Sequence, residues 1–257
     1  MFSAREYVRA RSVAEAHELN RPRMNAVLGG ATWLKMGRKN MGTAIDLSGL
    51  GLDNITETED EFRIGCMCTL RTLELHEGIH RAFGGAVREA LRHIVGVQFR
   101  NCATVGGSVF GRYGFSDVLT VLMALDTRVR LHKGGEMPLS RFSKMPKDRD
   151  ILEEIIIKKD GRKAGYAAFR RSSGDFPVIT AAVARLSDRV FVSVGARPGR
   201  AEMIQLPAAE DIPELAREAA GRFSYNGNMR GSAEYRRHLA EVYIRRAFEK
   251  IGEGDSV

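Results

Sequence analysis

Two glycine-rich segments contain the residue types that could bind phosphate. Residues 28–33 have the sequence LGGATW, and residues 103–108 have the sequence ATVGGS. Each glycine pair offers backbone N–H groups without shielding side chains, next to a hydroxyl, which suits close approach of a phosphate. Neither segment has the Gly-Lys-Ser/Thr of a P-loop or the G-x-G-x-x-G spacing of a Rossmann turn. The pattern is therefore consistent with two loops that share the phosphates of a dinucleotide, or with two ordinary tight turns.

An acidic residue follows the second glycine segment. Asp117 lies ten residues after Gly107. Its carboxylate could accept hydrogen bonds from a ribose or ribityl hydroxyl. Ser116 and Asp117 also suit the start of a helix, and both roles can hold together.

Patterns for nucleophilic or metal chemistry are weak in this sequence. Among six histidines, His76 and His80 are four residues apart and could share a helix face, but no third ligand follows. We therefore expect no metal site and assign no catalytic residue. Cys66 and Cys68 lie on the apolar face of an alternating segment, which predicts burial. With Cys102 the chain has only three cysteines, whereas an ordinary iron–sulfur cluster needs four thiolates, so we expect no cluster in this chain.

The elements that must position these groups mix helices and strands without strict alternation, which favours an α+β fold over a doubly wound sheet. Capping residues and apolar spacing predict helices that begin near residue 12, over 84–96, from 116 to about 125, and over 232–251. Strands are expected within 25–34, where one leads into the first glycine turn, and over 44–47, 63–70, 128–132, 151–157 and 189–195. Residues 198–213 are expected to form a polar connection, and a domain boundary is expected near residue 160.

Composition limits the class of protein. The 257 residues are 44% hydrophobic and 28% charged, as in an ordinary globular protein, and the net charge is +8. The basic residues are spread along the chain, and the densest group, at 236–237 and 245–246, falls on an expected helix. This favours a solvated face or subunit contacts over nucleic acid. No apolar run is long enough for a membrane span, no secretory signal is evident, and the few cysteines favour a reducing cytoplasm.

Several segments resemble one protein family. Residues 100–108 (RNCATVGGS) resemble the RNxATIGGN signature of the FAD-binding medium subunits of molybdenum hydroxylases, which include xanthine dehydrogenase, aldehyde oxidoreductase and carbon monoxide dehydrogenase. Further similarities run in family order: 28–34 to AGGTDLL, 64–69 to IGAxxT, 116–126 to ADLxPxLLALDA, 169–175 to the flavin-proximal loop and 230–239 to RASAEYRRHL.

The resemblance implies a fold and a domain division. It implies an FAD-binding domain of the vanillyl-alcohol-oxidase (PCMH) type over residues 1–160, in two α/β subdomains of about 1–55 and 56–160. A C-terminal flavoprotein domain over 161–257, an antiparallel sheet with helices, would follow.

The resemblance also implies particular cofactor contacts. The FAD pyrophosphate would lie on Gly29, Gly30, Ala31 and Thr32 of the first segment, flanked by Leu28 and Trp33. The second phosphate and the ribityl chain would lie on the second segment, at Thr104, Gly106, Gly107 and Ser108. Asp117 would bind the adenosine or ribityl side. The two segments are expected to converge on one pyrophosphate, and a Gly107→Val variant is expected to fold but to lose flavin.

The chain departs from the family near the flavin. Ser108 stands in place of the usual asparagine, and residues 112–115 (RYGF) replace a small ASPxA passage. Alanines occupy positions 167 and 168, where many relatives have a lysine whose charge stabilises reduced flavin. Arg170 or Arg171 could supply that charge, or both could be surface residues. Tyr113 could cover the flavin, or pack within its loop.

The resemblance implies an electron-transfer subunit. Electrons would pass from [2Fe–2S] clusters on a partner iron–sulfur subunit, supplied by a molybdopterin-binding subunit, through FAD to NAD+ or another acceptor. Two alternatives remain: a stand-alone FAD-dependent oxidoreductase of the same fold, and a flavin-less assembly or binding protein.

Overall fold

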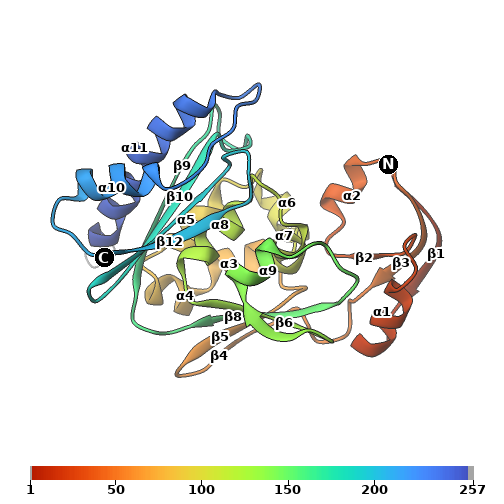
Figure 1. Ribbon diagram of the computed structural model, residues 1–257. Helices are drawn as coiled ribbons and strands as arrows, with labels where there is room; N and C mark the ends of the chain where they lie inside the picture. The colour runs from red at the N-terminus through yellow and green to blue at the C-terminus, as the bar shows by residue number, and fades with distance from the viewer. Residues whose placement is uncertain (1, 254–257) are drawn as a thin grey trace.

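The N-terminal part of the chain forms a small parallel sheet. The computed structural model describes residues 2–253, and its described part contains three sheets (Figure 1). The first sheet has the strand order β1–β3–β2, formed by β1 (Ser3–Arg9), β2 (Ala26–Leu28) and β3 (Asn40–Asp46). Helices α1 (Val13–Asn20) and α2 (Thr32–Met36) connect these strands. Ser12 caps α1 as predicted, and its side chain accepts a hydrogen bond from the Glu15 amide.

The middle sheet is antiparallel, with the strand order β4–β5–β8–β6–β7. Its strands are β4 (Ile55–Glu57), β5 (Glu61–Gly65), β6 (Thr127–Leu131), β7 (Gly135–Pro138) and β8 (Leu152–Lys158). Six helices lie between β5 and β6: α3 (Leu70–Leu75), α4 (Glu77–Ala82), α5 (Ala86–Arg92), α6 (Val97–Cys102), α7 (Val105–Gly111) and α8 (Asp117–Ala124). A further short helix, α9 (Leu139–Lys144), precedes β8.

The third sheet is also antiparallel, with the strand order β12–β11–β10–β9. Its elements are β9 (Lys163–Phe169), β10 (Ile179–Leu186), β11 (Arg189–Gly195), β12 (Glu202–Pro207), α10 (Ile212–Gly221) and α11 (Ala233–Glu253). Helix α11 packs on β9 and β10, while α5 and α8 pack against this sheet from the middle of the molecule (Figure 1). Covered on both faces, β10 is buried from residue 179 to 184, which explains its continuous run of small and apolar residues.

These sheets confirm the predicted α+β class and the C-terminal antiparallel sheet. Two expectations were wrong. The strand predicted over 63–70 ends at Gly65, because the chain turns there with the Cys68 amide bonded to the Gly65 carbonyl, and α3 then begins after its cap Thr69. Residues 198–213 are more than a connection, since they contain β12 and the start of α10. An edge strand with a single buried residue has too weak an apolar alternation to be recognised.

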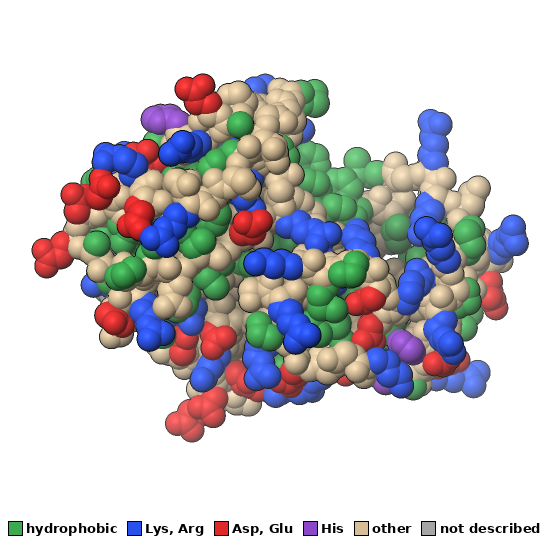
Figure 2. All heavy atoms as spheres, viewed as in Figure 1, with side chains coloured by type: hydrophobic (Ala, Val, Ile, Leu, Met, Phe, Trp, Pro, Cys, Tyr) green, Lys and Arg blue, Asp and Glu red, His purple; other side chains and the backbone are tan. Residues whose placement is uncertain are grey.

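The surface mixes both signs of charge. Figure 2 shows basic and acidic side chains intermingled over the viewed face. It also shows a recess between the N-terminal lobe, formed by the first sheet with α1 and α2, and the rest of the molecule. One member of the basic group expected on a solvated helix face is buried: Arg236 is 1% exposed. Its guanidinium donates to the carbonyls of Val178 and Ala196 and to Asn228 Oδ1, so it joins α11 to the third sheet and to the preceding loop. The described residues contain no helix that is long and apolar enough to cross a membrane.

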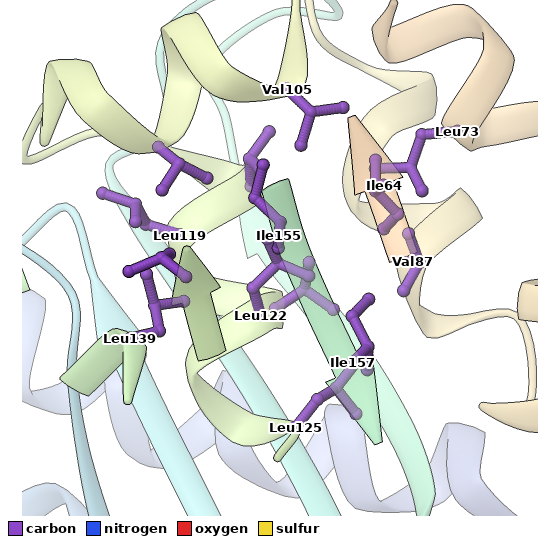
Figure 3. Packing of buried hydrophobic residues seen from close by; sticks show 14 of the residues in the cluster. Ile64, Leu73, Val87, Val105, Leu119, Leu122, Leu125, Leu139, Ile155 and Ile157 are labelled. Carbon is purple, nitrogen blue, oxygen red and sulfur yellow. The ribbon is translucent and has the colours of Figure 1, made fainter. Parts of the chain in front are cut away.

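The larger hydrophobic core lies between the middle sheet and the helices that cover it. Figure 3 shows side chains from β5, β8 and five helices packed together: Ile64, Leu73, Val87, Val105, Leu119, Leu122, Leu125, Leu139, Ile155 and Ile157. A buried ion pair strengthens the helical layer at its edge, where Arg100 Nε of α6 lies 2.7 Å from Glu74 Oε2 of α3. Arg100 also donates to the Ile94 carbonyl. The arginine of the RNCATVGGS segment therefore holds the helix that leads into the second glycine segment.

Candidate cofactor site

The two glycine segments touch each other. Gly29 follows β2, and Gly107 lies in the first turn of α7. A Cβ atom added to Gly29 would lie 2.9 Å from Thr104 Oγ1 and 3.5 Å from Gly107 Cα, and one added to Gly107 would lie 3.3 Å from the Gly29 carbonyl oxygen. The predicted convergence is therefore confirmed, although residues 34–102 separate the segments in sequence. That they hold a pyrophosphate stays a prediction here.

Close backbone contacts explain why glycine is needed at this junction. Gly30 has φ +60°, and a Cβ atom there would lie 1.9 Å from the Cys102 carbonyl oxygen. At Gly107 a Cβ atom would already be 3.0 Å from Thr104 Oγ1, so a valine would disturb the junction itself. The expectation that Gly107→Val folds but loses flavin stays a prediction.

Backbone donors at the first segment remain available. The Ala31 amide donates to the Gly29 carbonyl, whereas the amides of Gly30 and Thr32 have no acceptor within residues 2–253. The second segment is held more firmly, because Thr104 caps α7 and its Oγ1 accepts from the Gly107 amide at 3.1 Å. Ser108 Oγ in turn donates to the Thr104 carbonyl. Unpaired amides beside a glycine contact suit an anionic ligand.

A cavity of about 690 Å3 lies at this junction, a size typical of cofactor sites. Ten of the residues expected from the sequence line it: Gly29, Ala31, Thr32, Trp33, Thr104, Gly106, Gly107, Ser108, Asp117 and Arg170. Three expected residues do not. Leu28 pairs in β2, Gly30 packs on the Cys102 carbonyl, and Arg171 is exposed and donates to the Arg230 carbonyl.

One end of the cavity is aromatic. Trp33, Tyr113, Phe115 and Phe176, from three separate segments, have ring centroids 4.5–5.6 Å apart in every contacting pair. Trp33 and Phe176 are stacked, as are Tyr113 and Phe115. Rings at these separations form a surface on which a planar aromatic group can stack. Phe115 and Phe176 were not expected from the sequence, because single aromatic residues in loops carry no periodic signal.

Asp117 and Arg170 form a buried ion pair in the cavity wall. Arg170 Nη2 lies 2.5 Å from Asp117 Oδ1, and the two side chains are 8% and 7% exposed. The Tyr166 hydroxyl donates to the same carboxylate oxygen. Burial raises the pKa of Asp117, and the Arg170 guanidinium and the Tyr166 hydroxyl oppose that rise. Asp117 Oδ1 is thus committed to protein partners, and the adjacent Ser116 supplies the α8 cap.

Two of the three cysteines are buried. Cys66 and Cys68 are buried, and burial raises the pKa of each thiol to about 12. Cys102 is exposed. No group of three potential metal ligands occurs in the described part of the chain. His76, considered for a metal, caps α4 through Nδ1. The absence of iron stays a prediction for chemical analysis.

A further arginine, which the sequence gave no reason to select, ties the N-terminal lobe to the cavity. Arg149 donates to the backbone carbonyls of Asn20, Pro22 and Asn25. Lys147, two residues earlier, lies over the Tyr113 ring at 5.5 Å. The loop before β8 therefore lines the cavity, and Arg112 at the end of α7 donates to its Met145 and Pro146 carbonyls.

The site suits a dinucleotide with a planar ring system. A glycine junction with unpaired amides lies in the same cavity as an aromatic surface, and the buried Arg170 Nε has no partner within residues 2–253. The residues present therefore fit FAD, with its anionic pyrophosphate and its aromatic isoalloxazine. Fold and site together define an α+β protein in which two glycine segments meet at a cavity of cofactor size.

Comparison with known proteins identifies the family. Residues 2–159 match the model described as the FAD binding domain in molybdopterin dehydrogenase, and residues 164–251 match the CO dehydrogenase flavoprotein C-terminal domain. The chain belongs to the FAD-binding medium subunits of the molybdenum hydroxylase family.

Individual relatives agree with this membership. The chain is 29% identical over 250 residues to an uncharacterized protein, YgfM, of Escherichia coli K12, covering 93% of each chain. It is 29% identical over 234 residues, or 81% of each chain, to the nicotine 6-hydroxylase medium subunit of Paenarthrobacter nicotinovorans. Among solved structures, carbon monoxide dehydrogenase from Hydrogenophaga pseudoflava shares the fold with a TM-score of 0.84 at 20% identity, covering 97% of both chains.

Proposed function

We propose that this chain is the FAD-binding electron-transfer subunit of a xanthine dehydrogenase-like molybdenum hydroxylase. A molybdopterin-binding subunit supplies electrons to the [2Fe–2S] clusters of an iron–sulfur subunit. The clusters pass these electrons to FAD, which passes them to NAD+ or another acceptor. The family membership and the medium-subunit relatives support this proposal. The complex is proposed to be cytoplasmic, with residues 1–160 as the FAD-binding domain and 161–257 as the C-terminal domain.

Contact between the two glycine segments carries the proposal. Bound FAD would supply redox chemistry that accepts electrons singly or in pairs. The protein's part is to bind and orient. The unpaired Thr32 amide, beside Gly29 and Ala31, would hold the pyrophosphate, and Trp33 with its aromatic neighbours would hold the ring. Gly106, Gly107 and Ser108 would line the second phosphate and the ribityl chain.

Arg170 is the cation best placed for the flavin. Of the two arginines expected near it, Arg170 lines the cavity and is almost fully buried, whereas Arg171 is exposed. A guanidinium beside a flavin stabilises negative charge on the reduced ring, since attraction between charges is strong where water is excluded. Arg170 would thus supply the charge that a lysine supplies in many relatives.

The test is the cofactor content and activity of the purified chain. We expect FAD to be released on denaturation, in one equivalent per chain, and slow dye-linked NADH oxidation without hydroxylase activity. A chain that neither contains nor takes up FAD would favour the flavin-less assembly protein. Hydroxylation of a substrate by the chain alone would favour the stand-alone oxidoreductase.

A further inference from the structure

A buried three-residue network joins the two matched regions of the chain at the cavity. Asp117 begins α8 in the first region, while Tyr166 and Arg170 lie on β9 and just after it in the second. As whole residues, Tyr166 is 2% exposed and Asp117 is 5% exposed. Both Tyr166 and Arg170 donate to Oδ1 of the one carboxylate. The arginine that lines the cavity is therefore held through Asp117 by a tyrosine that does not line it.

The surroundings leave this network with few other charges. Glu89 and Arg92 of α5 are the remaining charged groups that interact with Tyr166 or with His93, the cavity histidine that follows this helix. Burial, followed by the charge of Arg92, lowers the pKa of His93, which also lines the cavity. His93 is thus neutral at neutral pH, and Asp117 is the only anion that contacts Arg170 within the described residues.

We propose that Tyr166 is a positioning residue, whose hydrogen bond to Asp117 favours the carboxylate form and so holds Arg170 as a clamped, charge-balanced cation at the flavin cavity. This inference rests on the proposed flavin function and deepens it. Two-electron reduction of a flavin with uptake of one proton leaves one negative charge on the ring. If Arg170 keeps its position and Asp117 keeps its charge, the stabilisation of the reduced flavin does not change around neutral pH. If Asp117 took up a proton in this range, the stabilisation would change with pH.

Removal of the Tyr166 hydroxyl makes Asp117 titrate. A hydrogen bond to the charged form of a carboxyl stabilises that form, so its loss allows burial to raise the pKa of Asp117 further. Once Asp117 takes up a proton, the charge of Arg170 is no longer offset, and reduced flavin becomes more stable. Tyr166→Phe keeps the buried ring and removes only this donor.

The first experiment compares adjacent arginines in the full chain reconstituted with FAD. We expect Arg170→Gln to weaken FAD binding by about tenfold and to lower the flavin midpoint potential, as expected for loss of a charge-assisted hydrogen bond donor. Arg170→Lys keeps the positive charge and should show a smaller drop in midpoint potential than Arg170→Gln. Arg171→Gln is the matched control and should match the wild type. An Arg170→Gln potential equal to that of the wild type would overturn the inference.

The second experiment isolates Tyr166 by pH. The difference in midpoint potential between Tyr166→Phe and the wild type should be small at about pH 8.5 and grow more positive toward about pH 6. Adding Asp117→Asn to Tyr166→Phe should make that difference independent of pH. A constant difference in the single variant would show a merely structural tyrosine. Failure of the wild-type chain to bind FAD would instead refute the proposed function.

Discussion

Gly30 is the position at which the smallest change should disable the site. Its φ of +60° lies in the left-handed region, and an added Cβ would lie 1.9 Å from the Cys102 carbonyl oxygen. The contact is with backbone that leads directly into the second glycine segment. Gly30→Ala must therefore move one glycine segment relative to the other, and the unpaired amides of the first segment move with it.

The cost can be worked out in two parts. An L-residue in the left-handed region costs about 1–2 kcal/mol. Forcing a methyl group against fixed backbone adds about 1–3 kcal/mol. The free energy of unfolding should thus fall by about 2–5 kcal/mol, out of the 5–15 kcal/mol typical of native proteins. Loss of one charge-assisted hydrogen bond to the pyrophosphate would weaken FAD binding by about tenfold to a hundredfold.

Gly135 provides the matched control. Its φ is +64°, and an added Cβ would meet nothing within 4 Å, so Gly135→Ala carries the conformational cost without the clash. Chemical denaturation and FAD titration of both variants separate the two effects. We expect Gly135→Ala to lose about 1–2 kcal/mol of stability and to bind FAD normally. Equal destabilisation in both variants, or unchanged FAD affinity in Gly30→Ala, would refute the reasoning.

Three further predictions concern residues elsewhere in the site and core. Trp33 is the only tryptophan, so FAD binding should quench most of the intrinsic fluorescence, and Trp33→Phe should bind FAD without that signal; no quenching on binding would contradict its place in the cavity. Glu74→Gln should cost about 3–5 kcal/mol in denaturation at neutral pH, because it leaves Arg100 buried and unpaired. Burial opposes ionisation of Glu74, but the contacts with Arg100 and Arg71 outweigh it and lower the pKa of Glu74. The stability that the ion pair contributes is therefore lost as pH falls through that lowered pKa. The difference in free energy of unfolding between wild type and variant should become smaller over this pH range. At pH 8 a thiol reagent should modify Cys102 alone in the folded chain, since burial raises the pKa of the other two thiols to about 12, and iron should be negligible; three reactive thiols or stoichiometric iron would contradict this.

The fold class and the long elements could be predicted because their signals are local. The amphipathic spacing over 232–251 corresponds to α11, and the alternation over 189–195 corresponds to β11. Edge strand β12 and helix α7 were missed for different reasons. Strand β12 buries only Leu206, and helix α7 has a high glycine content that predicts a loop unless its neighbours are known. Both elements form because of contacts with parts of the chain that are distant in sequence.

The site was predictable to the extent that it is continuous in sequence. The glycine segments could be found from composition and resemblance, and their convergence follows from both. The sequence could not tell which of Arg170 and Arg171 lies at the cavity, because only the fold shows that Arg170 is buried and Arg171 is exposed. Tyr166 carries no signal at all, since its partner Asp117 lies on another sheet-and-helix layer.

The most direct test of the central claim is purification of the native assembly through a tag on this chain, followed by quantification of FAD, iron, sulfide and molybdenum. We predict that an iron–sulfur subunit and a molybdopterin-binding subunit accompany the chain, that FAD is bound to this chain, and that hydroxylase activity is present only in the assembly. A chain that purifies alone and hydroxylates a purine or an aldehyde without molybdenum would contradict the account.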